Sequence, residues 1–184
     1  EAQCLDVIRQ LGEAADTVQW LFVPRHPQRF DAVAQLIEQA GWRVARRSQW
    51  ALDTPPDTPP HTSPDAPRTL WLGDSLGEMQ AYYHLASVAW LGGSFEPLGG
   101  QNLIEAAACG CPIVMGPHTF NFADAAEQAQ QQGAAQRVDT MAQAWAATQA
   151  WLHSPSSLSA AQQACRQWLA QGQGAARRCA QSLL

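Results

Sequence analysis

The sequence contains no lysine, so all 11 of its basic residues are arginines. Charged residues make up only 15% of the 184 positions, and the formal net charge is -5. A nucleic-acid-binding surface needs a clustered excess of basic residues that neutralise phosphates. The charge balance therefore argues against nucleic acid as a partner.

Long apolar runs and a leader segment are also missing. No stretch approaches the roughly 18–20 apolar residues of a membrane span. Residue 1 leads directly into a helical pattern and not into a signal peptide. We expect the chain itself to be soluble, and its abrupt beginning suggests that a further segment lies upstream.

Cysteines are few and do not follow the pattern of a disulfide framework. The five residues are odd in number, which favours a reducing, cytosolic setting. Cys109-Gly-Cys111 lacks the two-residue gap of a metal-binding pair, and no second pair lies nearby. Small buried cysteines explain this spacing equally well. We expect neither a metal nor a cofactor.

Helical and strand patterns alternate along the whole chain. Strands are predicted over 18–23, 42–46, 69–72, 88–91, 112–115 and 135–138, and helices over 5–11, 27–40, 76–82, 102–109, 123–132 and 140–184, the last with breaks near Pro155 and Gly172. The strands are continuous apolar runs, which is typical of a parallel sheet buried on both faces. The prediction is an α/β fold with a Rossmann-like parallel sheet flanked by helices. The length favours one domain over 1–184, with a Pro-rich loop at 53–67.

Ligands of such sheets bind at the carboxyl ends of the strands, so the loops that follow strands are candidates. The first is Pro24-Arg25-His26-Pro27. The planar guanidinium of Arg25 suits a phosphate. An arginine that caps a helix or pairs with a surface carboxylate is an equally good interpretation, and His26 is more typical of a structural turn.

The second candidate loop follows the strand at 69–72. Asp74 or Ser75 can cap the next helix, and Glu78 occupies the far position of a capping box. That structural interpretation covers most of the pattern. A functional role would come from exposed backbone groups around Leu76 and Gly77, which could read the edge of a base.

The third candidate is the glycine-rich segment 92–100, which leads into a helix beginning near Asn102. Glycines allow close approach of a ligand, and the free N–H groups of a helix start favour a phosphate. Glu105 lies on the same helix face as Asn102 and suits ribose hydroxyls. The pattern describes a nucleotide site, although the dinucleotide fingerprint is absent. A tight turn followed by a first-turn glutamate is the structural alternative.

The fourth candidate is the segment 116–122, which follows the strand at 112–115. His118, Thr119 and Asn121 are polar groups at the same edge of the sheet. They could contact a sugar or cap the next helix, and the sequence does not separate these roles.

Four strings of this sequence resemble one family. They are VPRHPQRF (23–30), GDSLGEM (73–79), GGSFEPLGGQNLIEAAA (92–108) and GPHTFNF (116–122). Their order and spacing resemble the C-terminal domain of bacterial 3-deoxy-D-manno-octulosonic acid (Kdo) transferases, which have the two-domain GT-B fold. The resemblance covers roughly residues 18–180.

The resemblance implies transfer of Kdo from CMP-Kdo to a lipid A precursor in lipopolysaccharide synthesis, at the cytoplasmic face of the bacterial inner membrane. It implies that Pro24 and Arg25 contact CMP and that Leu76, Gly77 and Glu78 hold the cytidine. It implies phosphate and ribose binding by Asn102, Leu103, Ile104 and Glu105. The family's catalytic base, acceptor site and membrane association belong to an N-terminal domain that this sequence lacks. We expect these residues to bind the donor without transferring Kdo alone.

The sequence departs from the family at Gln101, where the family usually has histidine. Glu96 suggests the paired glutamates of other retaining GT-B enzymes, but its spacing to Glu105 is one residue too long. Two alternatives stay open. One is a GT-B transferase or epimerase that uses a UDP-sugar, and the other is a non-catalytic nucleotide-binding module.

Overall fold

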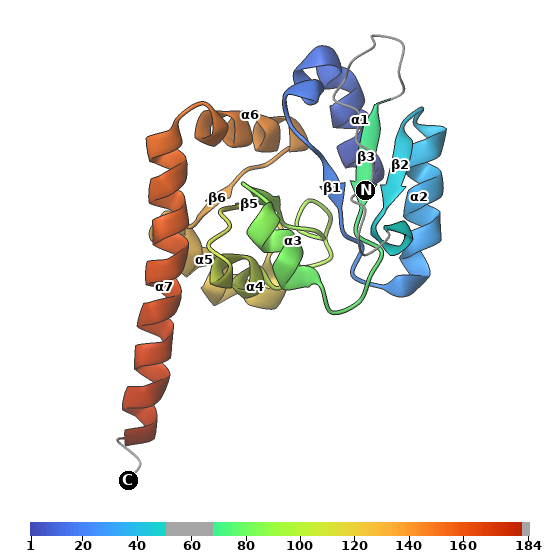
Figure 1. The fold of residues 1–184 in the computed structure, drawn as a ribbon. Helices are drawn as coiled ribbons and strands as arrows, with labels where there is room; N and C mark the ends of the chain where they lie inside the picture. The colour runs from blue at the N-terminus through green and yellow to red at the C-terminus, as the bar shows by residue number, and fades with distance from the viewer. Residues whose placement is uncertain (51–67, 182–184) are drawn as a thin grey trace. The chain divides into compact units, whose positions relative to one another are not determined.

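The computed structural model describes residues 1–50 and 68–181, with side chains through residue 171. The predicted loop at 53–67 lies outside the described residues. The chain divides into two compact units, Glu1–Met79 and Gln80–Leu184 (Figure 1). A single nucleotide-binding domain over 1–184 stays a prediction.

The first unit contains a three-stranded parallel sheet in the order β1-β3-β2. Its elements are α1 (Ala2–Leu11), η1 (Gly12–Thr17), β1 (Leu21–Phe22), η2 (Pro27–Arg29), α2 (Phe30–Gln39), β2 (Arg43–Arg46), η3 (Arg47–Gln49) and β3 (Thr69–Leu72). The helices bury one apolar stripe each, which includes Ile8 of α1 and Val33 and Ile37 of α2, against Leu70 and Leu72 of β3. The i, i+4 spacing of Val33 and Ile37 places them on one helix face.

Strand β1 is shorter than predicted. Only Leu21 and Phe22 pair with β3, at Trp71 and Leu72, although the apolar run predicts a strand over 18–23. β1 is an edge strand with one neighbour, and Pro24 has no N–H with which to extend the ladder. The sheet therefore ends just before the Pro24–Pro27 turn.

The second unit contains another three-stranded parallel sheet, in the order β4-β5-β6. Its elements are α3 (Met79–Leu85), β4 (Ala89–Trp90), α4 (Leu103–Ala108), β5 (Ile113–Met115), η4 (Phe120–Phe122), α5 (Ala123–Gln131), β6 (Ala135–Arg137), α6 (Met141–Leu152) and α7 (Pro155–Gln181). All three residues of the central strand β5 are fully buried. Both units thus confirm the prediction of an α/β fold with parallel strands flanked by helices.

The break predicted near Gly172 is wrong, whereas the one near Pro155 is confirmed. Helix α6 ends at Leu152 and α7 begins at Pro155, a position where the missing N–H of proline costs nothing. Helix α7 then continues through Gly172 to Gln181. A glycine inside a helix costs only about 1 kcal/mol relative to alanine, which an otherwise helical segment tolerates.

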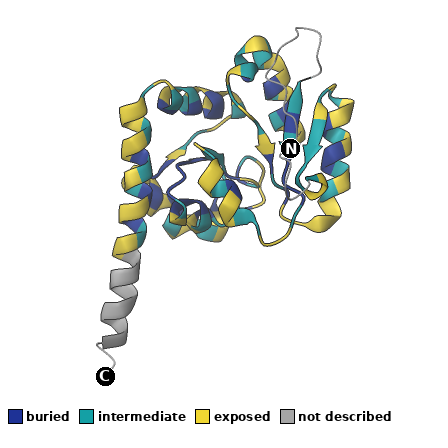
Figure 2. Ribbon diagram, in the orientation of Figure 1, coloured by how far each residue is buried: buried dark blue, intermediate teal, exposed yellow. Residues whose placement is uncertain are grey.

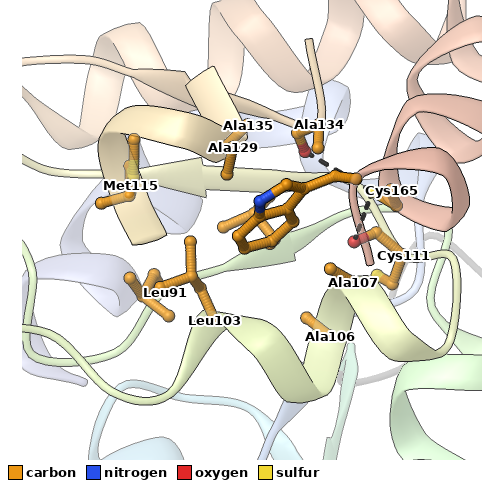
Figure 3. Close-up of a cluster of buried hydrophobic side chains, with 13 residues drawn as sticks. Leu91, Leu103, Ala106, Ala107, Cys111, Met115, Ala129, Ala134, Ala135 and Cys165 are labelled. Atoms are coloured by element: carbon orange, nitrogen blue, oxygen red, sulfur yellow. Dashed lines mark hydrogen bonds between the residues drawn. The ribbon is translucent and has the colours of Figure 1, made fainter. Parts of the chain in front are cut away.

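The core of the second unit includes two of the cysteines (Figure 3). Cys165 on α7 donates weak hydrogen bonds to the carbonyls of Cys111 and Ala134, at 3.6 Å each. Burial raises the pKa of Cys111 to about 12 and that of Cys165 to about 11. These side chains are packed thiols, as the sequence predicts for Cys111.

Figure 2 shows that α2 and α7 each carry buried residues on one side and exposed residues on another. Among the helices in the described ranges, none combines the length and the hydropathy of a membrane span.

Candidate nucleotide-binding loops

Arg25 follows strand β1 in a turn whose first residue, Pro24, is buried. Arg25 and His26 are both exposed. No residue in the described ranges forms a hydrogen bond or ion pair with the guanidinium of Arg25. The structural alternative for Arg25 was a helix cap or an ion pair with a surface carboxylate. Neither is found among those residues.

The loop at 73–78 leaves the same edge of the first unit's sheet. The N–H of Gly73 donates to the carbonyl of Phe22 at 2.8 Å, so the ends of β3 and β1 are adjacent. Helix α3 begins only at Met79, which leaves Asp74 and Ser75 outside it. The predicted helix cap at Asp74 or Ser75 is therefore wrong, because both residues lie too far before the first turn of α3.

Asp74 is buried and accepts three hydrogen bonds. Its carboxylate receives the Nε–H of Arg46 at 2.6 Å and both the N–H and the hydroxyl of Ser48, at 2.8 and 2.7 Å. Burial by itself would raise the pKa of Asp74. The bonds from Ser48 and Arg46 outweigh that effect and leave the pKa of Asp74 below its ordinary value.

Arg46 also bonds the exposed carboxylate of Asp31, at 2.8 Å. Its hydrogen bonds to Asp74 and Asp31 raise the pKa of Arg46 further above its ordinary value.

Glu78 has partners on both carboxylate oxygens. Arg47 donates to one oxygen at 2.7 Å, and the hydroxyl of Ser75 donates to the other in a short hydrogen bond. The Arg47 guanidinium also lies over the ring of Trp50, 5.2 Å from its centre. Between the two paired acids, Leu76 is 71% exposed and Gly77 has φ +79°. The exposure of these two residues agrees with the predicted reading of a base edge, which stays a prediction.

In the second unit, the glycine-rich loop folds back on itself. The N–H of Gly100 donates to the carbonyl of Gly93, and that of Gln101 to the carbonyl of Gly92. The Gln101 side chain lies against Gly92, 3.1 Å from where a Cβ would stand there. The residue that replaces the family histidine thus covers the start of the loop.

Ser94 joins this loop to the turn at 116–118. Ser94 is fully buried. Its hydroxyl donates to the carbonyl of Leu91 at 2.6 Å and accepts from the N–H of Gly116 at 2.8 Å. The N–H of His118 donates to the Ser94 carbonyl. Gly116 has no space for a side chain, since a Cβ would overlap the Ser94 carbonyl.

Asn121 holds the far side of the glycine-rich loop. Its amide group donates to the carbonyls of Leu98 and Gly100, at 3.0 and 3.4 Å. A Cβ on Gly99, whose φ is +87°, would overlap Asn121 and Phe120. Asn121 is therefore a structural support of the loop, and it does not cap the next helix.

Arg137, the last residue of β6, holds the same turn from the other side. Its guanidinium donates to the hydroxyl of Thr119 at 2.8 Å and to the carbonyls of Gly116 and Pro117. Thr119 is buried. Of the three polar groups predicted at this edge, only His118 has a side chain without a hydrogen bond or ion pair to any residue in the described ranges.

The start of α4 brings Asn102 and Glu105 together, as their spacing predicts. The Asn102 side chain accepts the N–H of Ile104 at 3.1 Å and donates to the Glu105 carboxylate at 3.0 Å. Leu103 is fully buried, and Ile104 is 39% exposed. A carboxylate can accept about four hydrogen bonds, so Glu105 keeps capacity for hydroxyl donors.

Five residues that take part in these loops were not identified from the sequence. They are Arg46, Arg47, Ser48, Ser94 and Arg137. For the first three the signal was the order of strands: β2 and β3 are parallel neighbours, so residues at the end of β2 and directly after it lie beside acids directly after β3. Within residues 1–50 and 68–171, no group of three His, Cys, Asp or Glu side chains could hold a metal ion.

Several known proteins resemble this chain, although no family model matches it. It is 45% identical to the 3-deoxy-D-manno-octulosonic acid transferase of Bordetella pertussis over 163 residues, which are 89% of this chain and 36% of that protein. It is 38% identical to the protein of the same name from Haemophilus influenzae over 102 residues, 55% of this chain and 21% of that protein. The chain thus spans about a third of the first relative's length and less of the second's.

A solved structure resembles the chain over nearly its whole length. It is the crystal structure of the C-terminal CMP-Kdo binding domain of WaaA from Acinetobacter baumannii. The TM-score is 0.76 at 27% identity, and the match covers 91% of this chain and 82% of that one.

Proposed function

Because the chain belongs with the C-terminal domain of the Kdo transferases, we propose that it is the donor-binding half of a glycosyltransferase that takes Kdo from CMP-Kdo. The likeness to a CMP-Kdo binding domain over 91% of the chain carries this proposal. In parallel sheets, the loops that follow the strands are where nucleotides bind.

Each unit contributes a defined set of residues to the proposed function. In the first unit, we assign the phosphate to the exposed Arg25, whose turn the buried Pro24 fixes. Leu76, Gly77 and Glu78 form the segment that we assign to the cytidine.

In the second unit, the first turn of α4 supplies N–H groups that have no partner within a helix. We assign the phosphate to Asn102, Leu103 and Ile104, and the ribose hydroxyls to Glu105. Ser94 and Asn121 hold the glycine-rich loop that leads into this helix start.

The chemistry that these residues offer is stabilisation of a leaving group. Transfer of Kdo breaks the bond between the sugar and the CMP phosphate and places negative charge on CMP. Preorganised N–H groups and an arginine stabilise such charge without a metal ion. The base that activates the acceptor, the acceptor site and membrane association belong in our proposal to the N-terminal domain of the full enzyme.

The acceptor in this proposal is a lipid A precursor, and the setting is lipopolysaccharide synthesis at the cytoplasmic face of the inner membrane. The family relationship is the support for this finer statement. A UDP-sugar enzyme would use the same helix start and glutamate, so the choice of base is the property to measure.

Calorimetric titration with CMP, and with UMP as the control nucleotide, tests the proposal. We expect saturable binding that favours CMP. Glu105→Ala should weaken CMP binding about tenfold, as expected for loss of a charged hydrogen-bond acceptor. The matched control is Glu127→Ala, which removes an exposed helical glutamate whose only described partner is Gln131.

Arg25→Ala should also weaken CMP binding, and Arg9→Ala, on the exposed face of α1, should not. Preference for UMP would support the UDP-sugar alternative. No binding of either nucleotide by the folded chain would count against the assignment of the donor site to these loops.

A further inference from the structure

A three-residue segment, Arg46–Ser48, holds both ends of the loop that connects β3 to α3. Arg46 and Ser48 bond the buried Asp74 at the start of the loop, and Arg47 bonds Glu78 at its end. These partners are 26 to 31 residues apart in sequence. Neither acid is oriented by its own loop alone, so the loop takes its shape from the end of the neighbouring strand.

The contacts of Asp74 and the Arg47–Glu78 pair differ in burial. We therefore expect the first to contribute to folding stability and the second to contribute mainly to the shape of the loop. The Asp74 side chain is only 1% exposed, so its contacts belong to the folded core. The side chains of Arg47 and Glu78 are 30% and 33% exposed. Ion pairs at such positions contribute little to folding. The Arg47 pair nevertheless restricts the part of the loop that is most exposed, Leu76 and Gly77.

The choice between cytosine and uracil depends on the orientation of hydrogen-bonding groups. Cytosine presents an amino donor where uracil presents a carbonyl acceptor, by the same rule that distinguishes C from T in DNA. A peptide carbonyl in a fixed direction accepts from the amino group and leaves the uracil oxygen unpaired. A peptide that can turn presents its N–H instead and accepts either base. Discrimination therefore requires that the peptide groups cannot reorient.

We propose that Arg47 is a positioning residue for cytosine selection: paired with Glu78 and placed over Trp50, it fixes the peptide groups of the Leu76–Gly77 segment against the base. This inference rests on the proposed function, in which the loop binds cytidine. Arg47 itself does not contact the nucleotide. Loss of Arg47 should therefore change the ratio of CMP affinity to UMP affinity, and should not weaken both nucleotides equally.

Titration of four proteins with CMP and UMP tests the proposal. In Arg47→Ala we expect CMP affinity to fall about fivefold, the equivalent of one hydrogen bond, with UMP affinity unchanged, so that the preference for CMP shrinks. Arg47→Lys should restore most of the preference, because an ammonium group also pairs with Glu78. The matched control is Arg43→Ala, which removes an arginine at the start of β2, the strand that ends just before Arg47, and whose bond is to Thr69.

Glu78→Gln provides a second test that does not depend on Arg47. It retains the size of the side chain and an acceptor for Ser75 but removes the ion pair, and it should reduce the CMP preference as Arg47→Ala does. Thermal unfolding shows that each variant is folded at the titration temperature. If either Arg47→Ala or Glu78→Gln is unfolded at that temperature, the folded one of the two is used for the comparison.

The outcomes separate this inference from the proposed function. If the unchanged chain prefers CMP and the variants keep the same ratio of affinities, the inference is overturned and the function stands. Equal weakening of CMP and UMP overturns it too, since that result describes a purely structural role. If the unchanged chain binds neither nucleotide, the proposed function fails and this inference fails with it.

Discussion

The two units support their loops by different means. Six ion pairs between described residues lie in the first unit. The loop at 73–78 is held there by charged partners. In the second unit the glycine-rich loop is held by neutral groups, chiefly Ser94 and Asn121, and by glycines that leave no space for side chains.

The comparison shows that a loop at the edge of a parallel sheet can be ordered by charge or by close packing. Hydrogen bonds to a buried carboxylate depend on its ionisation, whereas hydroxyl and amide bonds do not titrate. The first unit should therefore respond to acid and the second should not. Hydrogen exchange at β3 and β5 reports on the two units separately.

The largest effect is expected at Asp74. Asp74→Ala removes the acceptor of three hydrogen bonds and leaves the partly buried Arg46 with Asp31 alone, at a cost of about 3 kcal/mol of unfolding free energy. Exchange should accelerate in β3 and stay unchanged in β5. Equal acceleration in both strands would contradict the independence of the two supports.

The same residue should give the first unit its acid sensitivity. Its pKa is lowered in the folded state. The stability that Asp74 contributes is therefore fully present above the unfolded pKa of about 3.9 and is lost as pH falls through the lower folded value. Asp74→Asn should lack this loss below about pH 4. Parallel acid-unfolding curves for the two proteins would refute the assignment.

Gly116→Ala should produce the largest effect in the second unit. The added methyl group overlaps the Ser94 carbonyl, and overpacking against backbone costs about 2 kcal/mol. Chemical denaturation measures the loss, and exchange should accelerate in β5 but not in β3. Gly133→Ala is the control, because a Cβ there meets nothing within 4 Å, although its φ of +78° has a cost of its own. A smaller loss at Gly116 than at Gly133 would contradict the close-packing account.

Ser94→Ala should cost less, about 1.5 kcal/mol, because it leaves the N–H of Gly116 without the hydroxyl acceptor. The loss should be the same at pH 4 and pH 7, unlike that of Asp74→Asn. A loss that changes with pH would show that a titrating group takes part in the support.

The smallest effect is expected for an ion pair on the outside of the first unit. Arg9 and Asp6 are 60% and 64% exposed and 3.9 Å apart, so Arg9→Ala should change the unfolding free energy by less than about 0.5 kcal/mol. A larger change would contradict the view that burial decides how much an ion pair such as Arg9–Asp6 or Arg46–Asp74 contributes to the unfolding free energy.

The sequence predicted the parts of this fold that depend on local pattern. The strand at 69–72 has the predicted bounds. The helix start at Asn102, with its cap and its contact to Glu105, depends on residues three apart and was also predictable.

The parts that were missed depend on residues far apart in sequence. The bonds from Arg46 and Ser48 to Asp74 and from Ser94 to Gly116 join residues 22 to 28 positions apart. These residues are brought together only by the order of the strands in each sheet, and a local sequence pattern carries no information about that order. The error at Gly172 had the opposite origin, since a local signal was given more weight than the helical residues around it.

The most direct test of the central claim is hydrogen exchange of the unchanged chain with and without saturating CMP. The account predicts that CMP slows exchange at the amides of residues 76–78 and 103–105, and that UMP slows it less. Protection outside these residues and the Pro24–Pro27 turn, or equal protection by UMP, would contradict a cytidine nucleotide site built on these loops.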